Sequence, residues 1–223
     1  MKNYVPLLKI DLHLHTHYSR DSKTTLGEVI HYAKKRGLDG VAVTDHDTVQ
    51  GARRLAQQKD LLIIPGMEVS SLHGHILGLN ITEPVQPKKS ITETVEKIRQ
   101  LGGIAVIAHP AVAIKSGLGS RITSASSIDA VEVINASAFP FFLSTYLGRR
   151  LARRLALPQT AGSDSHFPEE IGSAYTFVDA DSNQDDIMEA LRNGKTIPVG
   201  KPISWMKRVA RGSEGIQERL RRL

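Results

Sequence analysis

Histidine and carboxylate residues follow several short apolar runs of this sequence. Residues 11–15 read Asp-Leu-His-Leu-His. Residues i and i+2 of an extended chain point to the same side, so His13 and His15 can reach one ion together. Asp164 and His166 form a second pair with this spacing after another apolar run. Imidazole nitrogens combined with carboxylate oxygens suit zinc, manganese or iron, so the spacing predicts a site for divalent metal ions.

Three more ligand-type residues, His46, Glu68 and His109, also come at the ends of apolar runs that read as strands. Active sites of α/β proteins lie at the carboxyl ends of the strands, so we expect these side chains to gather at one edge of the fold. A lone histidine at a strand end is commonly a surface or core residue. The repetition of the pattern is what indicates a site.

His75 opens an apolar run instead of ending one. Only six residues separate it from Glu68, too few for a crossover helix, so a direct turn keeps both residues at the same end. This predicts one strand pair that departs from parallel order. With His75 and Asp21 included, six of the nine histidines and three carboxylates fall at one end of the inferred sheet.

The elements that must position these residues alternate between apolar runs and amphipathic segments. Unbroken apolar runs indicate strands buried on both faces, at 7–12, 40–44, 61–65, 75–79, 104–108, 130–134 and 157–161. Capping-box sequences at 25–28 and 90–93 predict helix starts, and further helices are expected at 144–155 and 183–193. This alternation predicts an α/β fold. Periodicity alone leaves open whether the sheet closes into a TIM-like barrel or stays doubly wound.

Composition excludes several classes of protein. The 223 residues are 40% hydrophobic and include no cysteine, which excludes disulfides, thiolate zinc sites and a cysteine nucleophile. We find no apolar segment that could span a membrane and no secretory signal, so we expect a cytoplasmic protein without membrane partners. Residues 201–223 contribute +5 of the net charge of +6. We therefore expect a catalytic domain over 1–200 followed by a basic tail over 201–223.

Taken together, the motifs resemble those of the PHP (polymerase and histidinol phosphatase) superfamily, in that family's order, over roughly residues 7–200. The matching segments are His13-Leu14-His15, Thr44-Asp45-His46, Gly66-Met67-Glu68, His75-Ile76-Leu77-Gly78, Ala108-His109-Pro110 and Gly162-Ser163-Asp164-Ser165-His166. The resemblance implies a distorted (β/α)7 TIM-like barrel and a metal-dependent phosphoesterase. It also implies two to three divalent ions, manganese, zinc or iron.

Carried over residue by residue, the resemblance implies three metal sites. A first ion would take His13, His15, Glu68 and Asp164. Glu68 would bridge to a second ion that His75 and His109 also hold, and a third would take Asp21, His46 and His166. Of these residues, Glu68, Asp164 and His166 are the expected catalytic ones.

The sequence departs from the relatives that hydrolyse nucleoside bisphosphates or trim RNA ends. Those enzymes carry a helical insert between the histidine-containing HILG and AHP motifs, together with an arginine-proline-histidine signature. Here only 29 residues separate the two motifs, and the signature is missing. The resemblance is therefore to a compact form of the family, and it leaves the substrate open.

Phosphate also needs contacts from the protein. Lys115 and Arg121 lie in a Gly- and Ser-rich loop after His109, and Arg20 lies beside Asp21. These cations are candidates for binding substrate, as is Asn135 at the end of a strand, although each also fits a plain structural role. Asp11 and Asp45 flank ligands and are candidates for orienting their imidazoles.

Three functions remain open. The first is a phosphatase that uses a metal-activated water on a phosphomonoester, either a small metabolite or a nucleotide. The second is a nuclease acting on RNA or DNA ends, in which the arginines of 149–154 and the basic tail grip the polymer. The third is a non-catalytic scaffold, which would be expected to lose ligands. The sequence does not indicate an oligomeric state.

Overall fold

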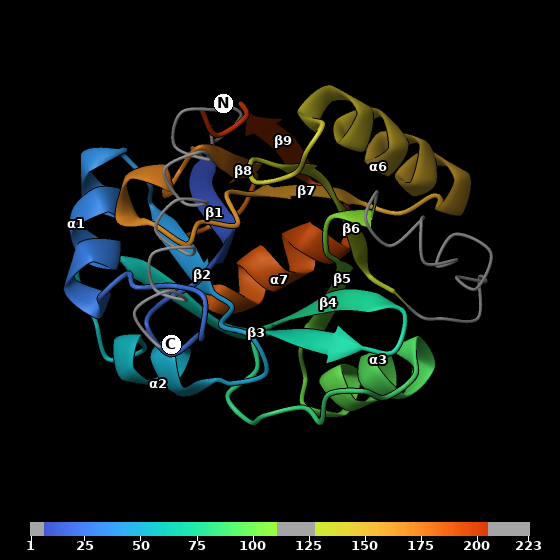
Figure 1. Ribbon diagram of the computed structural model, residues 1–223, viewed down its shortest axis with the longest axis horizontal. Coiled ribbons are helices and arrows are strands. Elements are labelled where there is room, and N and C mark those ends of the chain that lie inside the picture. Colours follow the sequence, from blue (N-terminus) through green and yellow to red (C-terminus); the bar gives the residue numbers. More distant parts are fainter. Residues whose placement is uncertain (1–6, 111–127, 205–223) are drawn as a thin grey trace, which may run out of the picture.

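The computed structural model describes residues 7–110 and 128–204. Figure 1 shows that the strands form a curved sheet and that helices connect them. The strands are β1 (Leu8–Leu14), β2 (Gly40–Val43), β3 (Leu62–Ser71), β4 (Gly74–Leu79), β5 (Ile104–Ile107), β6 (Ala130–Asn135), β7 (Gln159–Gly162), β8 (Ala174–Val178) and β9 (Thr196–Gly200). The helices are α1 (Leu26–Lys35), α2 (Gln50–Leu55), α3 (Ile91–Gln100), α6 (Phe141–Leu155), α7 (Gln184–Arg192) and the 3-10 turn η2 (Pro168–Glu170).

The strands form one sheet in the order β7-β6-β5-β4-β3-β2-β1-β8-β9. Strands β1, β2 and β3 pair in parallel, as do β5, β6 and β7. Strand β4 is antiparallel to both of its neighbours, which confirms the reversal predicted from the short turn before His75. Helices α1, α2, α3 and α6 lie around the outside of the sheet (Figure 1).

The sheet curls into a nearly closed barrel, because the ends of β1 and β7 meet. The main-chain N–H of His15 donates to the carbonyl of Ser165 at 3.0 Å, and the N–H of Asp164 donates to the carbonyl of His13 at 2.7 Å. The predicted distorted TIM-like barrel is confirmed, and the open doubly wound alternative is excluded.

Burial explains the apolar runs. Every residue of β2, β5 and β6 is buried, since helices cover one face of these strands and the barrel interior covers the other. In β6 the buried residues include one carboxylate, Glu132. None of the helices within 7–110 and 128–204 has the length and apolarity needed to cross a bilayer.

Local signals correctly located the helix starts at 25 and 90. Thr25 and Ser90 each accept the main-chain N–H three residues on, and the glutamate at that position reaches back, so both capping boxes are formed. Helix α2 was not predicted, because its first turn has no side-chain cap. Strands β8 and β9 were also missed. They form an antiparallel extension of the sheet, and β9 contains Pro198, which sequence rules read as an interruption.

Candidate metal centre

All nine predicted ligands come together at one end of the barrel. They are supplied by the carboxyl ends of β1, β2, β5 and β7, by the β3–β4 hairpin and by the loop after β1. The side chains are His13, His15, Asp21, His46, Glu68, His75, His109, Asp164 and His166. Apart from the pair His13/His15, the six histidines come from different segments of the sequence, and the curled sheet brings them within reach of one another.

Glu68 lies at the centre of the cluster and is 1% exposed. Its Oε1 is 2.8 Å from Nδ1 of His75 and 2.9 Å from Nε2 of His109. Its Oε2 is 3.2 Å from Nε2 of His13 and 3.1 Å from Nε2 of His15. Nδ1 of His46 lies 3.2 Å from the same Oε2. One carboxylate therefore contacts five imidazoles.

The spacing of the first donor group tests whether a cation fits. Nε2 of His13 is 3.2 Å from Nε2 of His15. Oδ1 of Asp164 is 3.5 Å from the first nitrogen and 3.2 Å from the second. Ligands about 2.0–2.1 Å from a tetrahedral ion are about 3.4 Å apart. The observed separations match that edge length, so a divalent ion fits this group.

The remaining donors form a more open side of the cluster. Oδ2 of Asp21 is 3.1 Å from Nε2 of His166 and 3.3 Å from Nε2 of His46. The side chain of Asp21 is 49% exposed, whereas those of His13 and His15 are inaccessible. A small molecule can therefore approach from the side of Asp21, His46 and His75, over the buried donors.

Hydrogen bonds and neighbouring charges keep His15 and Glu68 in their charged forms although both side chains are buried. Burial lowers the pKa of His15, but hydrogen bonds to Asp164 and Glu68 overcome this and raise it to about 9. Burial raises the pKa of Glu68, yet the charge of His13 and the hydrogen bonds of the histidines hold it well below its usual range. Glu68 is thus ionised at neutral pH, and binding of a cation would displace protons from the imidazoles.

The expected orienting carboxylates do not orient imidazoles. Asp11 accepts the main-chain N–H groups of Ser163 and Gly172, both at 2.8 Å, and Asp45 binds Thr16. Sequence reasoning instead missed Glu132, whose Oε1 is 2.9 Å from Nδ1 of His13. A carboxylate inside an apolar strand was the available signal, since a buried charge requires partners.

The proposed substrate-binding residues are placed differently from one another. Arg20 is exposed beside Asp21. Both N–H groups of Asn135 face carboxylates, Glu132 at 2.9 Å and Asp164 at 3.2 Å. Its Oδ1 is buried and has no hydrogen-bond partner within the described part of the chain. Lys115 and Arg121 lie outside the described residues, as does the tail from residue 205.

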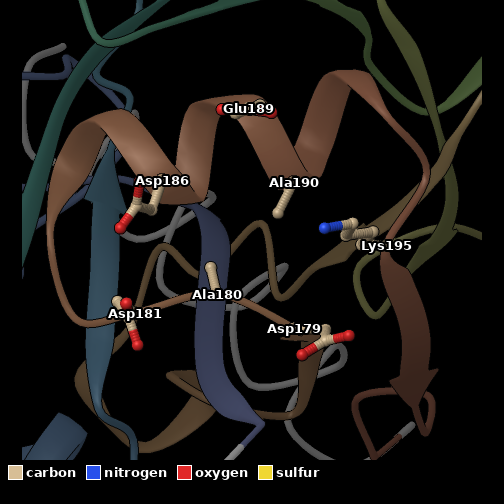
Figure 2. Close-up of a pocket in the computed structure, with 7 residues that line it drawn as sticks. All are labelled: Asp179, Ala180, Asp181, Asp186, Glu189, Ala190 and Lys195. Atoms are coloured by element: carbon tan, nitrogen blue, oxygen red, sulfur yellow. The ribbon is translucent and has the colours of Figure 1, made fainter. Parts of the chain in front are cut away.

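A separate hollow lies at the opposite end of the barrel. Figure 2 shows Asp179, Asp181, Asp186, Glu189 and Lys195 around it. Asp179 follows β8, which runs antiparallel to β1, so it lies beside the amino end of β1 and away from the histidines. The side chain of Asp186 accepts a hydrogen bond from Nδ2 of Asn183, the residue that caps the amino end of α7. This hollow is not part of the candidate metal centre.

Two family models match this chain. The family model for the PHP domain matches residues 11–127, and the family model described as PHP-associated matches residues 146–196. An uncharacterized protein of Methanocaldococcus jannaschii is 36% identical over 142 residues, which cover 58% of this chain and 82% of that protein. A phosphoribosyl 1,2-cyclic phosphate 1,2-diphosphodiesterase of Eggerthella lenta is 37% identical over 82 residues, or 33% of this chain and 31% of that enzyme.

Among solved structures, a two-domain protein from Bacteroides vulgatus contains a predicted PHP-like metal-dependent phosphoesterase. It superposes with a TM-score of 0.71 at 19% identity. The match covers 87% of this chain and 65% of that one. At this identity the match shows a shared fold.

Proposed function

Because this chain belongs to the PHP-domain family of metal-dependent phosphoesterases, we propose that it hydrolyses a phosphomonoester, with a small phosphorylated metabolite or a nucleotide as substrate. The observation that carries the proposal is the contact of Glu68 with five imidazoles, since a carboxylate can bridge two cations where a neutral imidazole binds one. A negative group at this point allows two cations to be held close together.

The donor groups support two to three divalent ions of manganese, zinc or iron. We assign His13, His15, Glu68 and Asp164 to the first, Glu68, His75 and His109 to the second, and Asp21, His46 and His166 to the third. When bound, such ions stabilise charge on phosphoryl oxygens and supply a nucleophile at neutral pH. Elemental analysis of protein purified without chelator should find two or three ions per chain.

The protein's own residues prepare this site. Nδ1 of His166 lies 3.1 Å from the carbonyl of Asp164, so its Nε2 is directed to the accessible side. Asp164 has φ of 51°, a left-handed backbone conformation that residues with a side chain rarely adopt, and here it directs the carboxylate toward the histidines. Glu68, Asp164 and His166 are therefore proposed as the catalytic residues, with Arg20 beside the entrance as a contact for the phosphate dianion.

A phosphatase assay tests the proposal. Chelator-treated protein is reloaded separately with Mn²⁺, Zn²⁺ or Fe²⁺ and offered a panel of sugar phosphates and nucleotides. We expect phosphate release that depends on the metal and is absent from the chelated sample. If no phosphomonoester of the panel released phosphate with any of the three metals, the proposal would be overturned.

One feature favours a nuclease as the second candidate. On α6, Phe142, Tyr146, Arg149 and Arg153 follow at i, i+4, i+7 and i+11 and so lie along one stripe. Phe142 is 79% exposed and Tyr146 is 58% exposed, and the helix has no acidic residue. Exposed aromatic rings followed by cations fit the bases and phosphates of single-stranded nucleic acid.

The stripe on α6 can be tested without disturbing the metal centre. Each base stacked on an aromatic ring is worth about 1–3 kcal/mol. The double variant Phe142→Ser/Tyr146→Ser should therefore lower turnover of a short 5′-phosphorylated oligonucleotide more than ~10-fold while leaving a small phosphomonoester unaffected. Equal turnover of both substrates by variant and wild type would remove the nuclease candidate.

A further inference from the structure

Glu132 is a buried carboxylate to which the sequence assigned no role. It lies in the middle of β6 and is 2% exposed. Removing an ion from water costs several kcal/mol unless partners compensate. Within the described residues, the hydrogen-bond partners of Glu132 belong to the metal centre or to its edge. Its Oε1 is 2.9 Å from Nδ1 of His13, and its Oε2 accepts the main-chain N–H of His109 at 2.9 Å.

We propose that Glu132 is a positioning residue that directs His13 and His109 toward the cations, an inference that rests on the proposed metal-dependent function. A neutral imidazole carries one proton, on either nitrogen. When Nδ1 of His13 donates to Glu132, the lone pair must lie on Nε2. That nitrogen faces His15, Glu68 and Asp164 at 3.2–3.5 Å.

The second oxygen of Glu132 acts on the backbone. His109 has φ of 28°, which is a strained value for a residue with a side chain. Strain of this kind costs about 1–3 kcal/mol and persists only where neighbouring groups enforce it. The hydrogen bond from the N–H of His109 to Glu132 is such a constraint. It turns the chain at the end of β5, where the ring of His109 meets Glu68 at 2.9 Å.

Asn135 extends this arrangement to a third ligand. Its Nδ2 donates to Oε2 of Glu132 at 2.9 Å and to Oδ2 of Asp164 at 3.2 Å. An amide nitrogen between two carboxylates screens their repulsion and keeps both in place. One buried charge thereby constrains His13, His109 and Asp164 from β6, a strand that supplies no ligand of its own.

The test compares Glu132→Gln with Asp129→Asn. The glutamine side chain keeps the volume, but its amide cannot accept hydrogen bonds on both sides, so either Nδ1 of His13 or the N–H of His109 is left facing a donor. Asp129 is also a buried carboxylate that accepts a main-chain N–H, from Ala105 at 2.8 Å, but it directly precedes β6, at the end away from the metal centre. The two variants should lose similar stability.

Binding of Zn²⁺ to chelator-treated protein is then measured by calorimetry. We expect Glu132→Gln to weaken binding about 10–100-fold, the usual effect of removing a carboxylate behind a metal-binding histidine, and Asp129→Asn to leave it unchanged. Equal affinity of both variants and wild type would show that Glu132 is structural only and overturn the inference. If the wild-type protein itself binds no metal, both the proposed function and this inference fail, and that result is distinguishable from equal binding by all three proteins.

A second measurement needs no variant. In the zinc-loaded wild-type protein, long-range ¹⁵N NMR should show the ring of His13 protonated at Nδ1, with that proton protected from exchange. Protonation at Nε2 would overturn the inference even if Glu132→Gln failed to fold.

Discussion

Replacing Glu68 with glutamine removes the central charge of the metal centre and keeps its volume. The carboxylate contacts five imidazole nitrogens at 2.8–3.2 Å. A cation bound among those nitrogens lies closer than about 4 Å to Glu68. At that distance, with an effective dielectric constant near 20, two unit charges interact by about 4 kcal/mol. Loss of this attraction corresponds to roughly 10³-fold weaker binding.

The assay combines metal content with turnover. We expect Glu68→Gln to bind fewer ions than wild type at equal free metal and to lose more than ~10²-fold in activity, as when a main electrostatic element leaves an active site. The control is His31→Ala, because His31 lies on the outer helix α1 and is exposed. Circular dichroism checks that both variants are folded. Normal ion content and turnover in Glu68→Gln would refute the placement of the site.

Four further predictions follow from other contacts. Asp11→Asn places an amide against main-chain donors and should lower the free energy of unfolding by about 1–3 kcal/mol in denaturant titrations. Gly162→Ala puts a methyl group directly against Cβ of His13, so thermal melting should show lower stability and zinc titration weaker binding, whereas Gly27→Ala, with open space around it, should show neither. In chelator-treated protein, the raised pKa of His15 contributes stability that is present below pH 6.5 and lost as the pH rises to about 9. The lowered pKa of Asp164 contributes stability present above about pH 4 and lost in acid, so melting temperature should peak between these ranges.

The local features of this protein follow from its sequence. Helix starts at Thr25 and Ser90 depend on contacts three residues apart, and the pairs His13/His15 and Asp164/His166 depend on the two-residue repeat of an extended chain. The reversed strand β4 was predictable because a short connection cannot hold a crossover helix. Each of these inferences uses geometry within a few residues.

Contacts between distant strands had to come from the tertiary structure. Asp11 and Asp45 were adjacent to ligands in sequence, yet they bind main-chain N–H groups and Thr16. Glu132, separated from His13 by 119 residues, is the carboxylate that meets its ring. A charge in a buried strand must find partners, and the sequence alone indicates that need. Which partners it finds depends on how the barrel closes, because only closure decides which strands face one another across the centre.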